Sequence, residues 1–149
     1  MIRTATKKDL NAVIELNNKL LLNEFNNFDP YIYRNWTKFP QGIKHFKKAI
    51  KNKLVMVAVE DEKIVGFLLC AITKIEYYNF KIGELVMMYV EEAYRRRGIA
   101  TALMNSSIEN FKSIGIEKFM LTASTKNEKA HLLYKKLGFE NLNSIFVKF

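Results

Sequence analysis

The sequence predicts a mixed α/β fold, in which a mostly antiparallel central sheet of six to seven strands carries helices on both faces. Two observations lead to this prediction. Apolar residues recur at helical spacing after a short opening strand, and an apolar hairpin follows. Strand and helix patterns then alternate through the rest of the chain. The 149 residues are enough for one domain with a substantial core, so we expect residues 1–149 to form a single domain.

The first half of the chain contains two predicted helices. The first helix follows Thr6-x-x-Asp9, which resembles a capping box. An aromatic-rich segment interrupted by two prolines separates the helices. The predicted elements are a strand over residues 2–5, helices over 7–22 and 42–51, and the irregular segment over 23–40 between them.

The second half contains the remaining strands and two further helices. A polar turn at residues 61–63 joins two apolar strands into an antiparallel hairpin. Gly115 and Gly138 are natural ends for the two helices. The predicted strands are 54–59, 64–72, 82–90, 118–123 and one or two over 139–149, and the predicted helices run from Gly98 to near Ile114 and over 127–137.

Residues 86–104 combine a strand, a basic turn and a helix. The apolar run that ends at Val90 is typical of a strand buried on both faces. Gly98 stands where the next helix begins, and the first turn of a helix offers free N–H groups and the positive end of the dipole. Three consecutive arginines precede that glycine. The pattern favours a site for a polyphosphate anion, and the alternative is a solvated basic turn before an ordinary core helix.

Three segments resemble those of the GNAT (Gcn5-related N-acetyltransferase) superfamily. The pattern Arg95-x-x-Gly98-x-Ala100 resembles the loop that binds the pyrophosphate of acyl-CoA. Residues 127–139 resemble the C-terminal motif of the family, with an Asn, an Ala three residues on, a Tyr seven on and then Gly-Phe. Residues 2–9 resemble the usual start of the family. The resemblance covers essentially the whole chain.

The resemblance implies an N-acetyltransferase that moves an acetyl group from acetyl-CoA directly to a primary amine in a ternary complex. It also implies that the strands over 82–90 and 118–123, the fourth and fifth, splay apart around the thioester. The acceptor stays open between a small molecule and a protein amine, and segment 23–40 is expected to help wall its site. The residues expected to contact acetyl-CoA are Met88, Tyr89, Val90, Arg95, Arg96, Arg97, Gly98, Ile99, Ala100, Thr101, Asn127, Ala130 and Tyr134.

Acetyl transfer needs an acid for the leaving thiolate, donors for the developing oxyanion and a route for the amine proton. The resemblance assigns Tyr134 as the general acid; its alternative is a core aromatic on the apolar stripe of its helix. The family device for the oxyanion is a set of strand N–H groups freed by a bulge, which by position belong to residues 88–90.

The sequence indicates the general base less clearly than the general acid. Glu84 interrupts an apolar strand, and burial would raise its pKa toward a useful value. Its position resembles the base of the histone-acetylating branch, and the alternative is an exposed glutamate at a strand edge. The branch that acetylates protein N-termini has a Glu near the position of Thr122, so that base is absent. Ordered water is a further route, and the remaining candidates are Glu76, Tyr77 and Glu24.

Composition narrows the function classes. The formal net charge of +9 suits a polyanionic ligand such as CoA, and the lysines are scattered, so we do not expect nucleic acid as a partner. No apolar run approaches the ~20 residues that span a bilayer, so we expect a cytoplasmic protein with no membrane partner. The single cysteine, Cys70, excludes a disulfide framework, and no metal site is expected. A homodimer is compatible with exposed final strands.

Two other function classes compete with the enzyme. The first is a non-catalytic module of the same fold that binds CoA and serves regulation or protein interaction. The second is a small basic nucleic-acid binder, which would need no discrete site at Gly98 and would bind with a steep salt dependence.

Overall fold

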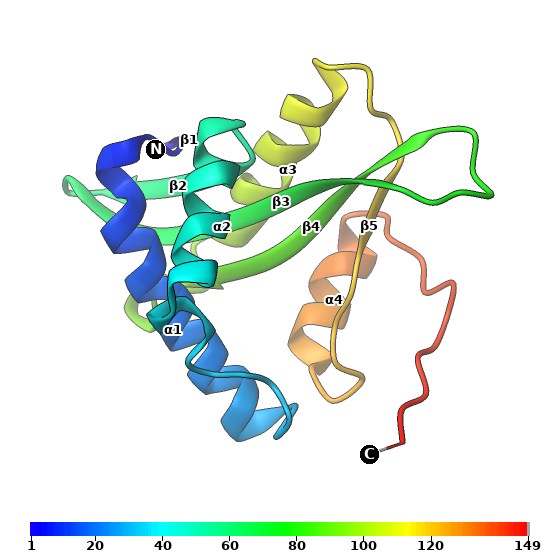
Figure 1. Ribbon diagram of the computed structural model, residues 1–149, viewed down its shortest axis with the longest axis horizontal. Helices are drawn as coiled ribbons and strands as arrows, with labels where there is room; N and C mark the ends of the chain where they lie inside the picture. Colours follow the sequence, from blue (N-terminus) through cyan, green and yellow to red (C-terminus); the bar gives the residue numbers. More distant parts are fainter. Residues whose placement is uncertain (149) are drawn as a thin grey trace.

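A computed structural model describes residues 1–148 and contains a five-stranded sheet (Figure 1). The strands lie in sequence order, β1-β2-β3-β4-β5. The first four pair antiparallel, and β5 pairs parallel to β4. Their bounds are β1 Ile2–Thr4, β2 Val55–Glu60, β3 Lys63–Lys74, β4 Lys81–Val90 and β5 Phe119–Leu121.

Four helices cover the two faces of this sheet (Figure 1). Helices α1 and α2 pack on one face, and α3 and α4 pack on the other. Short 3₁₀ turns at Lys7–Asp9, Trp36–Lys38 and Glu92–Tyr94 lead into or between these helices. The helix bounds are α1 Leu10–Asn27, α2 Pro40–Lys51, α3 Ile99–Lys112 and α4 Glu128–Lys136.

Strand β3 divides the core into two layers because successive side chains of a strand point to opposite faces. Phe67 and Leu69 are fully buried against α1 and α2, in the layer that also holds Phe46. Leu68 and Cys70 are buried in the second layer, which holds the side chains of α3. Burial raises the pKa of the Cys70 thiol to about 11, so it behaves as a small apolar core residue.

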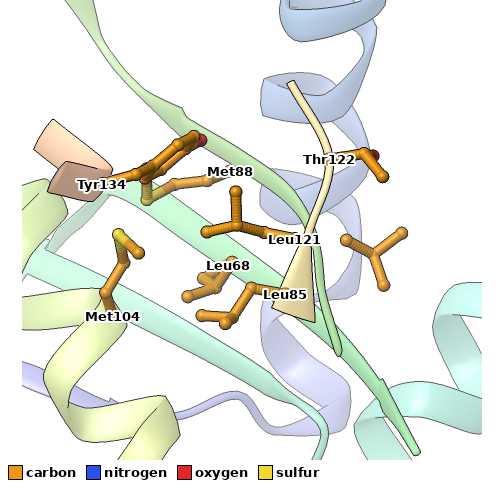
Figure 2. Close-up of a pocket in the computed structure, with 8 residues that line it drawn as sticks. Leu68, Leu85, Met88, Met104, Leu121, Thr122 and Tyr134 are labelled. Atoms are coloured by element: carbon orange, nitrogen blue, oxygen red, sulfur yellow. The ribbon is translucent and has the colours of Figure 1, made fainter. Parts of the chain in front are cut away.

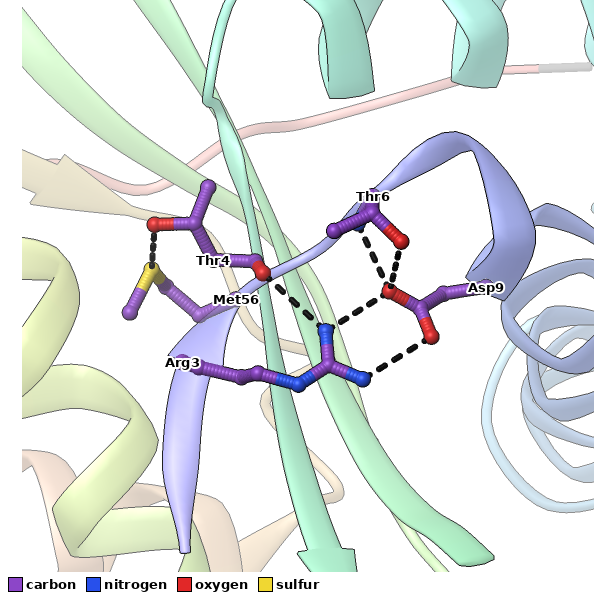
Figure 3. A network of polar contacts seen from close by, with 5 residues as sticks. All are labelled: Arg3, Thr4, Thr6, Asp9 and Met56. Atoms are coloured by element: carbon purple, nitrogen blue, oxygen red, sulfur yellow. Dashed lines mark hydrogen bonds and ion pairs between the residues drawn. The ribbon is translucent and has the colours of Figure 1, made fainter.

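The start of the chain is fixed by a polar network centred on Asp9 (Figure 3). Both oxygens of Asp9 accept hydrogen bonds from the Arg3 guanidinium, at 2.7 and 3.0 Å. The backbone N–H and the hydroxyl of Thr6 donate to the same carboxylate. These donors, Arg3 first, hold the pKa of Asp9 well below its usual range. The capping role predicted for Asp9 is confirmed.

Strand β4 changes its surroundings half-way along its length. Leu69 of β3 faces Met87, whereas the next residue, Cys70, faces Leu85, so Val86 is an extra residue in a bulge. On the opposite edge of β4, the pairing with β5 ends at Leu85. The two strands then diverge, as the resemblance implied for the fourth and fifth strands.

Several predictions need correction. The sheet has five strands within residues 1–148, not six to seven, because the described part of the segment after α4 contains no strand; residue 149 lies outside the described residues. The second half of β4 is not buried on both faces, since residues 87–89 are half-buried and Val86 is 36% exposed. Helix α1 continues to Asn27, five residues beyond the predicted end.

Candidate active site

Backbone stereochemistry decides which N–H groups of β4 face the gap left by β5. The N–H of Glu91 donates to the carbonyl of Val65 at 2.8 Å, so Val90 and Gly66 form a non-hydrogen-bonded pair of the antiparallel ladder. The N–H groups of Val90 and, two residues earlier, Met88 therefore point away from β3. No strand covers that edge beyond Leu85. Both N–H groups are directed into the gap between β4 and β5.

Tyr89 behaves differently from its two neighbours. The same alternation makes Tyr89 and Phe67 a hydrogen-bonded pair, so the N–H of Tyr89 is used by β3. The predicted trio of donors at residues 88–90 is thus reduced to two. The bulge at Val86 lies before these donors. Because of this extra residue, the N–H groups that point away from β3 belong to even-numbered residues after the bulge and to odd-numbered residues before it. Gly83 therefore also faces the β5 edge, and its N–H donates to the Lys118 carbonyl at 2.8 Å.

A small pocket of about 30 Å³ lies between the diverging strands, with room for about two water-sized groups (Figure 2). Tyr134 from α4, Met104 from α3 and Leu121 from β5 converge above the sheet. Its size suits the reacting end of an acyl thioester rather than a whole cofactor. The lining residues are Leu68, Leu85, Val86, Met88, Met104, Leu121, Thr122 and Tyr134.

Tyr134 is held in this pocket by the packing of α4. Its ring meets Phe139 edge-on, with centroids 6.3 Å apart, and it packs on the α3 layer of the core. Burial, followed by the nearby charge of Glu24, raises the pKa of Tyr134. The phenol is therefore protonated at neutral pH. Tyr134 therefore packs on the core and also lines the pocket, and its role as the general acid is still a prediction.

Asn127 caps the N-terminus of α4. Its side-chain oxygen accepts a hydrogen bond from the N–H of Ala130 at 3.2 Å. Two of the residues expected at the cofactor are therefore joined to each other and fix the start of the helix that carries Tyr134. The side-chain nitrogen of Asn127 donates no hydrogen bond within the described residues, so it is available to a ligand.

The turn between β4 and α3 presents an open helix N-terminus. Gly98 is the N-cap of α3 and adopts a left-handed conformation with φ of 79°. A Cβ at Gly98 would meet no atom within 4 Å, so the space in front of the helix is free. No side chain caps α3, which leaves the N–H groups of Ile99, Ala100 and Thr101 without a capping partner. This geometry suits a phosphate or pyrophosphate.

The three arginines of this turn have different surroundings. Arg95 donates from Nε to the carbonyl of Val90 at 2.8 Å, and Arg97 donates to the carbonyl of Ala93 at 2.9 Å. Both therefore brace the turn. Arg96 makes no hydrogen bond or ion pair within the described residues, and its backbone is left-handed with φ of 66°. Its guanidinium is the one most available to an anion.

Glu91 has a cationic partner, although an acid beside an anion site is unfavourable by itself. The ammonium of Lys19 on α1 forms an ion pair and a hydrogen bond with the Glu91 carboxylate. This contact neutralises the acid and joins the turn to α1.

Glu84 and Glu24 occupy contrasting places. Glu84 accepts a hydrogen bond from the Thr73 hydroxyl at 2.8 Å and is not among the residues that line the pocket. Glu24 lies on α1, where burial and the nearby Asp29 raise its pKa. Glu24 also contributes to the raised pKa of Tyr134, so its charge acts on the pocket.

The sequence prediction of the site missed most of the pocket wall. In the sequence, Leu68, Met104 and Leu121 show only the patterns of a strand or of the apolar face of a helix. Their apolar spacing is indistinguishable from that of ordinary core residues, because only the divergence of β4 and β5 turns a core face into a pocket. The extra residue Val86 has no sequence signal, since its neighbours are all apolar.

Comparison with known proteins agrees with this geometry. Residues 11–139 match the model of the acetyltransferase (GNAT) family. The chain belongs to the GNAT family. The resemblance is thereby confirmed, and N-acetyl transfer from acetyl-CoA is the activity of this family.

Two curated relatives and one solved structure illustrate the similarity. The chain is 34% identical to an uncharacterized N-acetyltransferase of Methanocaldococcus jannaschii, over 93% of this chain and 60% of that protein. It is 30% identical to an N-alpha-acetyltransferase of Sulfurisphaera tokodaii, over 95% of this chain and 80% of that protein. A predicted acetyltransferase of Clostridium acetobutylicum, solved with acetyl-CoA, superposes with a TM-score of 0.77 at 24% identity, covering 100% of this chain and 95% of that one.

Among residues 1–148, no group of three or more His, Cys, Asp or Glu side chains is arranged to hold a metal ion. In the same residues, no helix combines the length and the apolar character needed to cross a bilayer.

Proposed function

We propose that this GNAT protein transfers the acetyl group of acetyl-CoA to the α-amine at the N-terminus of a peptide or protein. The observation that carries the transfer chemistry is the open edge of β4, where the N–H groups of Met88 and Val90 face the gap between β4 and β5, beside a pocket that Met88 and Tyr134 line. The choice of an α-amine draws on the curated relatives named N-alpha-acetyltransferases. The proposal refines the acceptor, which the sequence left open.

In this proposal the cosubstrate lies along β4 and turns onto α3. The N–H groups of residues 99–101 bind the pyrophosphate, and Arg96 adds a cation. The open space in front of Gly98 supports this placement. Asn127 offers its side-chain nitrogen at the far side of the gap, while Arg95 and Arg97 keep the turn in shape.

The chemistry follows from the donors around the pocket. The N–H of Met88 donates to the thioester oxygen as negative charge develops, with Val90 aligned beside it. The Tyr134 hydroxyl gives its proton to the leaving sulfur. Its raised pKa keeps that proton in place at neutral pH. Bound acetyl-CoA supplies the activated acetyl group, and the chain supplies orientation and protons.

The acceptor enters from the side of the pocket where Thr122 is exposed. A glutamate near this position serves as base in the branch that acetylates protein N-termini, so this chain uses another group. Glu84 is still a prediction for that role, although its carboxylate is bound to Thr73. A homodimer is likewise still a prediction.

The proposal is tested with a panel of amine acceptors and acetyl-CoA. Peptides with a free N-terminus are compared with the same peptides blocked at the N-terminus and carrying an internal lysine, and with a polyamine. We expect acetylation of the free peptides only, located by mass spectrometry at the α-amine. Turnover of the polyamine or of the lysine side chain alone would contradict the proposed acceptor.

A further inference from the structure

Residues 30–59 form a strongly basic stretch of the chain. They contain seven lysine and arginine residues and no aspartate or glutamate, in a protein whose formal net charge is +9. Five of the seven are lysines of α2 and of the turn that follows it. These lysines are separated in the sequence, which is why the sequence did not indicate a nucleic-acid partner. The structure brings them together.

Helix α2 carries four of these lysines on one face. At 3.6 residues per turn, four side chains fall within an arc of about 100°: Lys44, Lys47, Lys48 and Lys51. All four are exposed. The opposite face of α2, which holds Phe46, is buried against the sheet. In Figure 1 no other helix or strand passes in front of α2, so the lysine face is open to solvent.

The lysine face is unfavourable for the protein by itself. Lysines three and four residues apart on a helix repel each other, and no carboxylate forms an ion pair with them within residues 1–148. The helix dipole favours cations in the last turn, which holds Lys48 and Lys51. Lys44 and Lys47 lie before that turn. A bound polyanion would remove the repulsion, so the face indicates a polyanionic partner.

Two exposed aromatic rings lie at the start of the same helix. Phe39 is the N-cap of α2 and is 43% exposed, and Tyr33 is 56% exposed. The two rings stack, with their centroids 5.5 Å apart. Lys38, next to Phe39, is exposed as well. Proteins that bind single-stranded nucleic acids combine these two features, since cations contact the phosphates and aromatic rings stack on the bases.

Other polyanions fit this surface less well. A membrane-binding helix needs apolar side chains that enter the bilayer, but Phe46 and Ile50 of α2 are buried in the core. An acidic protein would pair with the lysines and leave the exposed ring stack without a role. The bases of a duplex are already stacked on one another, so they are not available to Tyr33 and Phe39.

We propose that the lysine face of α2, together with Tyr33 and Phe39, binds single-stranded nucleic acid. The lysines contact successive phosphates, and the ring stack receives a base. From Phe39 to Lys51 the helix extends about 18 Å, which gives the strand a path along its axis. Helix α2 lies on the face of the sheet opposite α3 and α4. The inference goes beyond the proposed function and does not depend on it.

The test measures the fluorescence anisotropy of labelled poly(U) RNA of about 20 nucleotides, longer than the ~4–16 nucleotides of typical sites. Two triple variants change the net charge equally, and urea unfolding checks that both fold. Glutamine has a helix propensity similar to that of lysine. One variant carries Lys44→Gln, Lys48→Gln and Lys51→Gln on α2, and the control carries Lys129→Gln, Lys135→Gln and Lys136→Gln at exposed positions of α4.

The salt dependence gives the expected size of the effect. With four to five phosphate contacts, the plot of log K against log salt should have a slope of about −3 for the wild type. Removal of three contacts should lower the affinity by about 10²-fold at about 0.1 M salt and reduce the slope by about 2. The α4 variant should bind almost as tightly as the wild type.

A single change tests the ring stack. Tyr33→Ala should lower the affinity by about 10-fold, because a base loses its stacking partner. The salt slope should stay the same, since no phosphate contact is lost. Saturating acetyl-CoA should not displace the RNA, because the anion site at Gly98 is a different one.

Four results would overturn the inference. The first is a wild type that does not bind poly(U) even at low salt. The second is an equal loss of affinity in the two triple variants, and the third is displacement of the RNA by acetyl-CoA. The fourth is a Tyr33→Ala variant that binds as tightly as the wild type, or a duplex or poly-glutamate bound as tightly as poly(U), since the face would then accept any polyanion.

Discussion

The two halves of β4 are built from similar apolar residues but have different surroundings. Residues 81–85, the closed half, pair with β3 on one edge, and residues 83–85 also pair with β5 on the other. In residues 86–90, the open half, Val86 is the bulged residue and residues 87–90 pair with β3 alone. In the closed half the polar groups have partners, as in the bond between Glu84 and Thr73. In the open half the N–H groups of Met88 and Val90 have no partner from a strand. The chemistry of the protein is expected at these groups.

The comparison shows how the fold creates a reactive site without unusual residue types. One extra residue, Val86, and the early end of β5 are enough to expose backbone donors beside an apolar pocket. The closed half keeps the two strands in register, so that they part at a defined point. Stability and catalysis are therefore assigned to adjacent stretches of one strand.

The largest expected effect is on the acid of the open half. Tyr134→Phe removes one hydroxyl from the pocket and leaves the packing of the ring. We expect kcat to fall by about 10²–10⁴-fold while the Kd for acetyl-CoA is unchanged, as judged by steady-state kinetics and calorimetry. An unchanged kcat would assign Tyr134 to the core alone, and a wild type without any turnover would favour a CoA-binding module that is not an enzyme.

A proline pair distinguishes the two kinds of N–H in the open half. Met88→Pro removes a donor that β3 does not use, whereas Tyr89→Pro removes a ladder bond. We expect the first variant to fold and to lose about 10²–10³-fold in kcat. The second is expected to lose about 1–3 kcal/mol in the free energy of unfolding, because the carbonyl of Phe67 loses its hydrogen-bond donor. Equal loss of stability in both variants, measured by urea unfolding, would show that the assignment of donors is wrong.

The closed half should respond in stability and not in chemistry. A Cβ at Gly83 would lie 2.6 Å from the ring of Phe111 on α3. Gly83→Ala is therefore expected to lower the free energy of unfolding by about 1–3 kcal/mol. The kcat of the folded variant should stay near that of wild type. A Gly83→Ala protein as stable as wild type would mean that α3 packs more loosely on β4 than described.

The smallest expected effect concerns Asp9, a fully partnered carboxylate that contrasts with Glu24. Its pKa is depressed, so its contribution to stability is complete above the ordinary Asp pKa of about 4 and is lost as the pH falls toward its folded value. Asp9→Asn is expected to cost about 2 kcal/mol at pH 7. The difference from wild type should shrink below pH ~4. A difference that stays constant from pH 7 to pH 2 would contradict the pairing with Arg3.

The comparison also explains what could be predicted from the sequence. The helices, the hairpin and the basic turn at Gly98 were predictable because they depend on local spacing and on the freedom of glycine. The open edge was not, since Val86 looks like its neighbours and a bulge is decided by the pairing with β3. The prediction that the N–H of Tyr89 donates to the oxyanion was wrong because the pairing with β3 decides which N–H groups face the gap, and the sequence does not show that pairing.

The most direct test of the account is a calorimetric titration with acetyl-CoA of the wild type and of Gly98→Glu. The variant places a negative charge and a strained backbone at the open N-terminus of α3. The account predicts saturable 1:1 binding by the wild type that the variant abolishes. Absence of binding by the wild type at millimolar acetyl-CoA, or equal binding by the two proteins, would contradict the site.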